Sequence, residues 1–146
     1  MKGLVCKVCG YISIDGAAPD ACPVCHAPKS SFQENAEAVK TPRDINDMTE
    51  LEKKHSPVIL VLKKCGLIEG CVDVHVKIGA ILHPTLPEHS IGHVDFYIDK
   101  KFISRVILTP EKLNPACALH LKASEGRLSA IALCNIHGAW LGEINL

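Results

Sequence analysis

Short segments in which apolar and polar residues alternate dominate the chain after residue 57. The stretch 72–78 has valine or isoleucine at every second position, 94–98 repeats this pattern, and 58–62 is a continuous apolar run. Such patterns predict strands with at least one buried face. Further strands are expected at 102–108, 117–121, 128–133 and 140–146.

Turn signals between these segments predict how the strands pair. Asp99-Lys100-Lys101 predicts a hairpin of 94–98 with 102–108, and Ser124-Glu125-Gly126-Arg127 predicts a second hairpin of 117–121 with 128–133. About seven short strands separated by turns predict a mainly β protein with an immunoglobulin-like β-sandwich. Ahead of the strands, Thr49-Glu50-Leu51-Glu52 fits a capping box, which predicts a short helical turn running toward His55.

Composition limits the remaining possibilities. With 146 residues and 47% hydrophobic composition, one modest core is expected, and a second domain must be small or held by something other than burial. The formal net charge is zero with no long block of either sign, so no nucleic-acid partner is expected. No apolar run approaches membrane-spanning length, and Met1–Cys6 leads into a cysteine pair rather than a signal peptide, which predicts a cytoplasmic chain without a membrane segment.

Eight cysteines in a reducing compartment favour metal ligands and free thiols over disulfides. Cys6 and Cys9 form one C-x-x-C pair, Cys22 and Cys25 form another, and twelve residues separate the pairs. This spacing lets two tight turns face each other across a tetrahedral ion. Zinc and iron both suit such a site, so the spacing leaves the metal open. A segment this short needs the metal to fold.

The residues around these pairs resemble the rubredoxin-like domain of rubrerythrins. The resemblance rests on Cys9-Gly10-Tyr11, on the proline after Cys22, and on Ala27-Pro28-Lys29 followed by Phe32. It covers residues 1–36 and implies that the four cysteines hold one iron ion. Residues 37–48 are polar and weakly patterned, and we expect them to form a linker.

A second set of candidate ligands lies farther along the chain. Cys134 and His137 follow the apolar run 130–133, His83 and His89 flank a proline-rich loop, and His55 stands two residues before Pro57. Taken alone, a cysteine is more often a small buried hydrophobe than a ligand. The combination is what points to one metal ion.

In order and spacing, these three motifs resemble the superoxide reductases, the family that includes desulfoferrodoxins and neelaredoxins, over residues 49–146. The resemblance implies a catalytic iron held by His55, His83, His89 and His137 with Cys134 as the axial thiolate, and a sixth position open to superoxide. It implies two irons per chain, with zinc as an alternative in the N-terminal site. Lys54, next to a ligand, is expected to attract the anion.

The same resemblance implies partners. The N-terminal iron is expected to relay electrons from a rubredoxin or an NAD(P)H-linked rubredoxin reductase, and relatives form homodimers or homotetramers. The sequence departs from the family in two places: Lys53 stands where a glutamate is common, and His93 where a tryptophan is common. Neither change removes a ligand.

The remaining candidates are expected to be unrelated to metal. His26, His75, His93 and His120 are predicted to be surface histidines, and Cys65, Cys71 and Cys117 buried or incidental thiols. Two other functions stay open: an electron-transfer module with a structural zinc and no superoxide chemistry, and an enzyme that dismutates superoxide or reduces another small oxidant.

Overall fold

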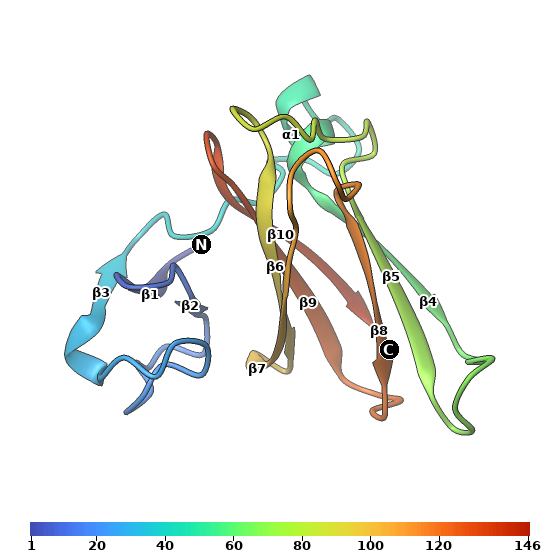
Figure 1. Ribbon diagram of the computed structural model, residues 1–146, viewed down its shortest axis with the longest axis horizontal. Coiled ribbons are helices and arrows are strands. Elements are labelled where there is room, and N and C mark those ends of the chain that lie inside the picture. The colour runs from blue at the N-terminus through green and yellow to red at the C-terminus, as the bar shows by residue number, and fades with distance from the viewer.

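The computed structural model describes residues 1–146 and is built mainly of β-strands. The N-terminal part contains β1 (Gly3–Cys6), β2 (Ile12–Ser13), the 3-10 helix η1 (Lys29–Ser31) and β3 (Phe32–Asn35). These strands form a small antiparallel sheet in the order β2-β1-β3, seen in blue at the left of Figure 1.

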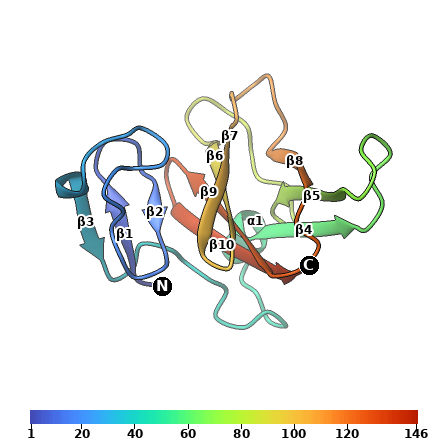
Figure 2. The ribbon, with the colours of Figure 1, turned by 90° about the horizontal axis from the view of Figure 1, so that it is seen from below.

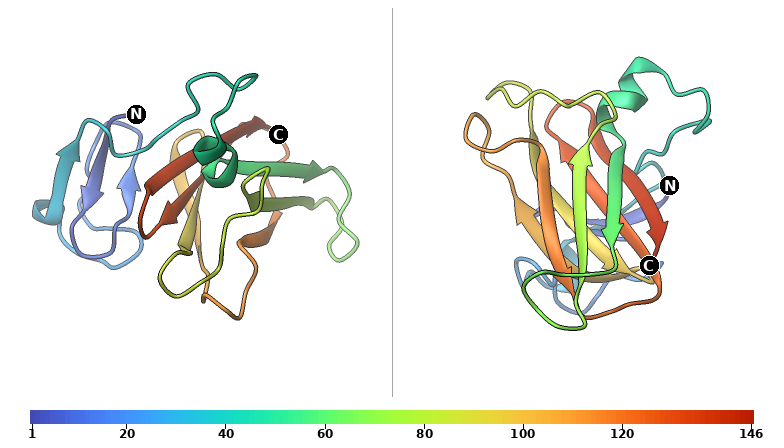
Figure 3. Two further views of the ribbon diagram at one scale, coloured as in Figure 1. Left: turned by 90° about the horizontal axis from the view of Figure 1, so that it is seen from above. Right: turned by 90° about the vertical axis from the view of Figure 1, so that its right-hand side faces the viewer.

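The larger part begins with α1 (Glu50–His55) and continues with seven strands. They are β4 (Pro57–Leu62), β5 (Val72–Ile78), β6 (Ile91–Ile98), β7 (Lys101–Ile107), β8 (Ala116–Leu121), β9 (Arg127–Cys134) and β10 (Gly138–Asn145). They form two antiparallel sheets, β10-β9-β6-β7 and β4-β5-β8, which Figure 3 shows from two further sides. The mainly β class, the seven strands and the hairpin of β6 with β7 are confirmed.

The alternating pattern of β5 places its apolar side chains between the two sheets. Val74, Val76 and Ile78 are at most 1% exposed and share a core with Phe96 and Leu128. The polar partners of this pattern, such as His75 and Lys77, are exposed on the outer face of the sheet.

The predicted second hairpin is wrong. β8 pairs with β5, whereas β9 pairs with β6 and β10, so the turn at 122–126 crosses from one sheet to the other. Both segments have an apolar face that needs the common core, and placing them in opposite sheets buries both. A turn signal alone does not distinguish a hairpin from such a crossing.

The capping box at the start of α1 is confirmed. Glu52 N–H donates to the Thr49 hydroxyl at 3.3 Å, and Thr49 N–H donates to the Glu52 carboxylate at 2.7 Å. The helix then delivers His55, its last residue, to a buried position. Neither this helix nor η1 has the length and apolar character needed to cross a membrane.

The N-terminal part packs against the outer face of sheet β10-β9-β6-β7, as Figure 2 shows from below. Tyr11 stacks on Tyr97 with ring centroids 6.2 Å apart, and the Tyr97 hydroxyl donates to the Ile12 carbonyl at 2.7 Å. Val39, from the segment predicted as a linker, is 1% exposed in the same cluster. Burial against the neighbouring sheet therefore adds to whatever a metal contributes to folding of this part.

Candidate metal centres

Two similar turns bring the four N-terminal cysteines together. Cys6 O accepts from Gly10 N–H and Cys22 O accepts from His26 N–H, both at 2.9 Å. Gly10 and His26 take φ values of 72° and 62°, which glycine adopts freely and histidine at a cost. The matching turns direct both cysteine pairs toward one point.

The spacing of the sulfur atoms fits a tetrahedral ion. The Sγ atoms of Cys6 and Cys25 are 3.7 Å apart and those of Cys9 and Cys22 are 3.6 Å apart. A metal–sulfur distance of about 2.3 Å gives a tetrahedron with sulfurs about 3.8 Å apart. Burial raises the pKa of Cys9 to about 12, with the neighbouring sulfurs adding to the rise. Four thiolates this close together repel one another, and a bound cation removes that repulsion.

The second centre lies at the end of the larger part where α1, the β5–β6 loop and the β9–β10 turn meet (Figure 1). α1 provides His55, and the loop provides His83 and His89. Strand β9 ends in Cys134, and the turn after it provides His137. These are the five residues expected from the sequence. His55, His83 and Cys134 are at most 2% exposed.

The four imidazoles surround a common point. Going round in the order His55, His83, His89, His137, neighbouring ring centroids are 4.7, 4.6, 4.9 and 4.6 Å apart. The diagonal pair, His55 and His89, are 5.9 Å apart. Ligand atoms of His55, His89, Cys134 and His137 all lie within 4.8 Å of one another, and His83 Nε2 lies 3.2 Å from His55 Nε2.

Hydrogen bonds at the outer edge of the rings indicate which nitrogens face this point. Nδ1 of His55 lies 2.7 Å from the Leu51 carbonyl, and Nδ1 of His83 lies 2.7 Å from the Pro84 carbonyl. A carbonyl accepts, so each Nδ1 carries the proton and each Nε2 has a lone pair. Two lone pairs 3.2 Å apart repel unless a cation lies between them.

His89 adds an independent sign of a missing ligand bond. Its Nε2 is buried and has no hydrogen-bond partner. Buried polar atoms are almost always paired, because an unpaired one costs about 1–3 kcal/mol. A metal ion at the common point satisfies Nε2 of His89 together with those of His55 and His83, so the residues fit a metal.

Cys134 supplies the only thiolate at this centre. Its Sγ lies 3.6 Å from Nδ1 of His137 and accepts from the His137 backbone N–H at 3.4 Å. These contacts hold the sulfur in place at the centre.

Three of the four histidines favour their neutral, metal-binding form. Burial, helped by the nearby His55, His89 and His137, lowers the pKa of His83 to about 4. Burial also lowers the pKa values of His55 and His137, helped by other imidazoles and by Lys40. Neutral imidazoles at pH 7 can all bind a metal without first losing a proton.

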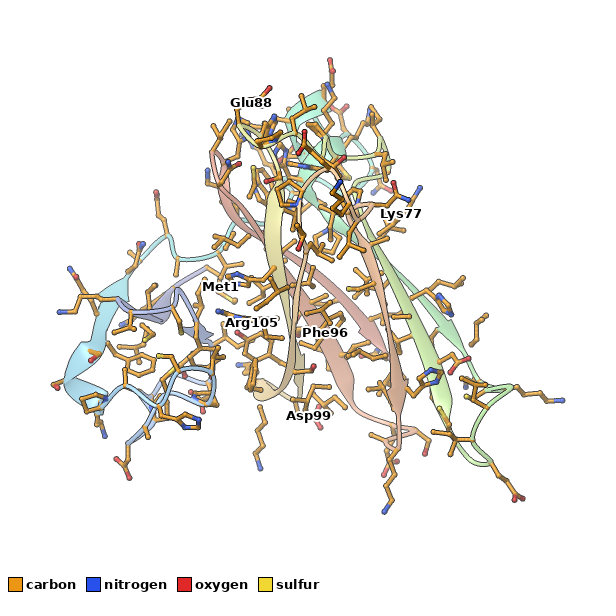
Figure 4. The ribbon with its side chains drawn as sticks, in the orientation of Figure 1. Met1, Lys77, Glu88, Phe96, Asp99 and Arg105 are labelled. Carbon is orange, nitrogen blue, oxygen red and sulfur yellow. The ribbon has the colours of Figure 1, made fainter.

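Backbone contacts hold the three segments together. Gly79 has a φ of 88°, and a Cβ there would lie 2.6 Å from the Lys54 carbonyl, so glycine allows the His83 loop to pass close to α1. Asn135 joins the other two segments, accepting from Ser90 N–H at 3.0 Å and donating to the Glu88 carbonyl at 3.1 Å. Figure 4 labels Glu88 at this end of the molecule.

Two charged residues of α1, Lys54 and Glu52, form hydrogen bonds with neighbouring groups. Lys54 Nζ donates to Glu50 at 2.5 Å with its side chain 38% exposed. The Glu52 carboxylate accepts from Thr49 N–H and, at 2.8 Å, from Arg43 N–H, so it is occupied at the start of the helix.

Sequence reasoning missed Lys40. Its ammonium donates to the His137 carbonyl at 3.0 Å and lies 5.6 Å from the centroid of the Trp140 ring. The Trp140 ring is in turn 5.3 Å from that of His55. Lys40 lies in a polar stretch without a motif, and only the parallel bridge of Lys40 to Trp140 brings it here.

Sequence reasoning also missed a third group. Cys65 and Cys71 were expected to be buried or incidental thiols and His120 a surface histidine. Cys71 is indeed buried and His120 exposed, but the ligand atoms of all three gather with a carboxylate oxygen of Asp73 within 4.8 Å of one another. His26 and His75 are exposed as expected, and Cys117 stands apart from all three groups.

A seven-stranded β-structure with four imidazoles and one thiolate at one end, joined to a four-cysteine knuckle, defines a class of proteins with two distinct metal centres. The family model described as Desulfoferrodoxin matches residues 47–143, and that described as Rubrerythrin, rubredoxin-like domain matches residues 5–33. The chain belongs to the desulfoferrodoxin family, and its N-terminal part is a rubredoxin-like domain of the rubrerythrin type.

Individual relatives agree with this assignment. The chain is 34% identical to a superoxide reductase from Pyrococcus abyssi over 105 residues, covering 64% of this chain and 88% of that protein. It is 30% identical to a desulfoferrodoxin homolog from Archaeoglobus fulgidus over 140 residues, covering 96% and 94%. A solved superoxide reductase (neelaredoxin) from Ignicoccus hospitalis has a TM-score of 0.59 at 28% identity, covering 75% of this chain and 94% of that one.

Proposed function

We propose that this protein is a superoxide reductase, which converts superoxide to hydrogen peroxide with one electron and two protons. The observation that carries the proposal is the convergence of four imidazoles and the Cys134 sulfur on one point, where His89 Nε2 has no other partner. Three protein segments build this point, and relatives that share the domain are described as superoxide reductases.

We assign iron to this centre, with His55, His83, His89, His137 and Cys134 as its ligands. Iron bound there supplies the single electron that superoxide accepts. An imidazole binds a metal through a neutral nitrogen, so Cys134 would provide the only negative charge among these ligands, and its electron density would strengthen the reducing character of a bound iron. The hydrogen bond of Ser90 N–H to Asn135 and that of His137 N–H to Cys134 Sγ hold the cysteine and histidine segments together at this centre.

Two lysines can attract the superoxide anion. Lys54 directly precedes His55 and is partly exposed, so we propose that it draws superoxide to this end of the molecule and orients a proton-donating water. Lys40 contributes positive charge on the His137 side. Screening of both charges should make the rate fall as ionic strength rises.

We assign a second iron to Cys6, Cys9, Cys22 and Cys25 in a domain spanning residues 1–36, with 37–48 as a connecting segment and 49–146 as the catalytic domain. This centre relays electrons from a rubredoxin or an NAD(P)H-linked rubredoxin reductase. Support for a route within one chain comes from Gly10, where an added Cβ would lie 3.8 Å from Leu133 Cδ2. Gly10 adjoins Cys9, and Leu133 adjoins Cys134.

We propose that the chain works in the reducing cytoplasm, because all eight of its cysteines are free. We also propose that it forms a homodimer or homotetramer, as expected from the family resemblance.

Metal analysis combined with a single-turnover reaction tests the function. The purified chain should contain two irons, and the pre-reduced protein should be oxidised at the histidine centre by one equivalent of superoxide. His83→Ala should abolish this oxidation, whereas His75→Ala, which removes an exposed imidazole from β5, should leave it unchanged. Zinc as the sole metal, or equal rates for both variants, would contradict the proposal and favour an electron-transfer module without superoxide chemistry.

A further inference from the structure

A third group of metal-ligand side chains lies on sheet β4-β5-β8, at the end opposite α1. Cys65 belongs to the hairpin loop that joins β4 to β5, Cys71 directly precedes β5, Asp73 lies in β5 and His120 in β8. Figure 1 shows this loop at the lower right, far from the helix. Their four ligand atoms lie within 4.8 Å of one another.

We propose that Cys65, Cys71, Asp73 and His120 bind a zinc ion that fastens the β4–β5 hairpin loop to strand β8. Two thiolates, an imidazole and a carboxylate are all ligands that zinc accepts in tetrahedral sites. The three segments they come from are neighbours in the sheet β4-β5-β8. The site is independent of both centres described above and of the proposed function.

Atom separations match the edges of a zinc tetrahedron. Nδ1 of His120 lies 3.3 Å from Cys65 Sγ and 3.6 Å from Cys71 Sγ, and Cys71 Sγ lies 3.6 Å from Asp73 Oδ1. Ordinary zinc–sulfur and zinc–nitrogen distances place a sulfur and a nitrogen ligand about 3.6 Å apart. The N-terminal cysteine centre of this same chain shows sulfur separations of 3.6 and 3.7 Å.

One separation shows what changes on binding. Nδ1 of His120 is 2.7 Å from Asp73 Oδ1, a hydrogen-bond distance shorter than a tetrahedral edge. In the metal-free chain His120 therefore donates its Nδ1 proton to Asp73. Zinc bound to Nδ1 would take the place of that proton.

Strand register places these ligands on one face without any adjustment. Asp73 and His120 are direct partners in the β5–β8 ladder, and Cys71 lies two residues before Asp73, on the same side of the strand. The intervening Val72 points into the core and is 7% exposed. The side chains of Asp73 and His120 therefore lie on the outer face of the sheet, and Cys71, which is 6% exposed, forms the buried side of the group.

The hairpin loop lacks the apolar packing that would otherwise hold it. Leu67 is 79% exposed and Ile68 is 57% exposed, so neither side chain anchors the loop. Leu67 N–H nevertheless donates to Cys65 Sγ at 3.3 Å, the kind of contact that supports a metal-bound thiolate. A metal bound through Cys65 provides the missing attachment.

Zinc content of the iron-loaded, full-length protein tests the proposal. After exposure to zinc and removal of loose metal by gel filtration, the chain should retain one zinc beyond its iron. The variants Cys65→Ser and His120→Ala should each lose that zinc and keep the iron. Cys117→Ser and His75→Ala are matched controls, because they remove a thiol from β8 and an imidazole from β5 outside the group, and they should retain it.

A second measurement follows the loop itself. Zinc should slow amide exchange or proteolysis between residues 63 and 71 in the unaltered chain and have no such effect in Cys65→Ser. Absence of an extra zinc, equal retention by Cys65→Ser and the controls, or a disulfide between Cys65 and Cys71 seen by mass spectrometry under non-reducing conditions would each overturn the proposal. Because iron content and superoxide reduction are read separately, this failure is distinguishable from failure of the proposed function.

Discussion

Replacing Arg105 by methionine should destabilise the protein and loosen the rubredoxin-like domain. Arg105 forms a bidentate ion pair with Asp95, with N···O distances of 2.6 and 2.7 Å, and also donates to the Cys9 carbonyl at 2.8 Å. Figure 4 labels Arg105 at the boundary between the two parts. Burial alone would lower the pKa of Arg105, but its hydrogen bonds to Asp95 and that carboxylate's charge raise it on balance.

The size of the effect follows from burial. The side chains of Asp95 and Arg105 are 2% and 10% exposed, so removing Arg105 leaves a carboxylate in the interior without its guanidinium partner. His93 Nε2 lies 3.9 Å from Asp95 Oδ2 but does not replace that charge, because burial lowers the pKa of His93. Breaking such a pair costs about 3–5 kcal/mol. For a chain of this length each kcal/mol lowers the melting temperature by about 2–4 °C, so the expected decrease is about 6–20 °C.

Thermal unfolding of the metal-loaded protein measures this decrease. Arg127→Met is the matched control, because Arg127 pairs with Glu143 on the surface of the same sheet and is 57% exposed. It should change the melting temperature little. The double variant Asp95→Leu/Arg105→Met should recover part of the loss, because it removes the unpaired carboxylate. A decrease for Arg105→Met no larger than that of Arg127→Met would refute the reasoning.

Three further substitutions address the two centres. Cys134→Ser should keep the fold and lower turnover by at least about 100-fold, the upper end of the losses seen when residues supporting a metal ligand are removed; retained turnover in a steady-state assay would contradict the thiolate's role. Cys9→Ser should eliminate the N-terminal centre yet leave the single-turnover reaction of pre-reduced protein nearly unchanged in stopped-flow mixing, and loss of that fast step would contradict the division of labour. Glu52→Ala should leave the visible spectrum of oxidised protein unchanged and still responsive to azide, because the Glu52 carboxylate is held by Thr49 and Arg43. The neighbouring Lys53 cannot bind the metal either, since a protonated ammonium has no lone pair. A large spectral change would show that Glu52 is a ligand.

Local patterns predicted most of the strands because each strand has one face toward a common core. The valine alternation of 72–78 and the capping box at Thr49 were sufficient to locate β5 and α1. The pairing between strands was harder to predict from the sequence, as the wrong hairpin of β8 with β9 shows. β8 is an edge strand that β9 could have joined, so the turn residues alone do not show that β9 lies between β10 and β6 in the other sheet.

Candidate ligands were predictable where their motifs were recognisable. Spacing pointed to the four-cysteine site, and the histidine and cysteine motifs of the second centre matched a family pattern. Cys65 and His120 are 55 residues apart and no motif links them, so only the β5–β8 ladder brings them together. Lys40 is similar, since its approach to His137 depends on a backbone bridge to Trp140.

The products formed by the reduced protein test the central proposal most directly. Pre-reduced chain mixed with a limiting amount of superoxide should yield one hydrogen peroxide per superoxide consumed and no dioxygen, because the electron comes from the protein. Equal amounts of dioxygen and peroxide would show dismutation, and unreacted superoxide would show that the histidine and cysteine centre does not perform this chemistry.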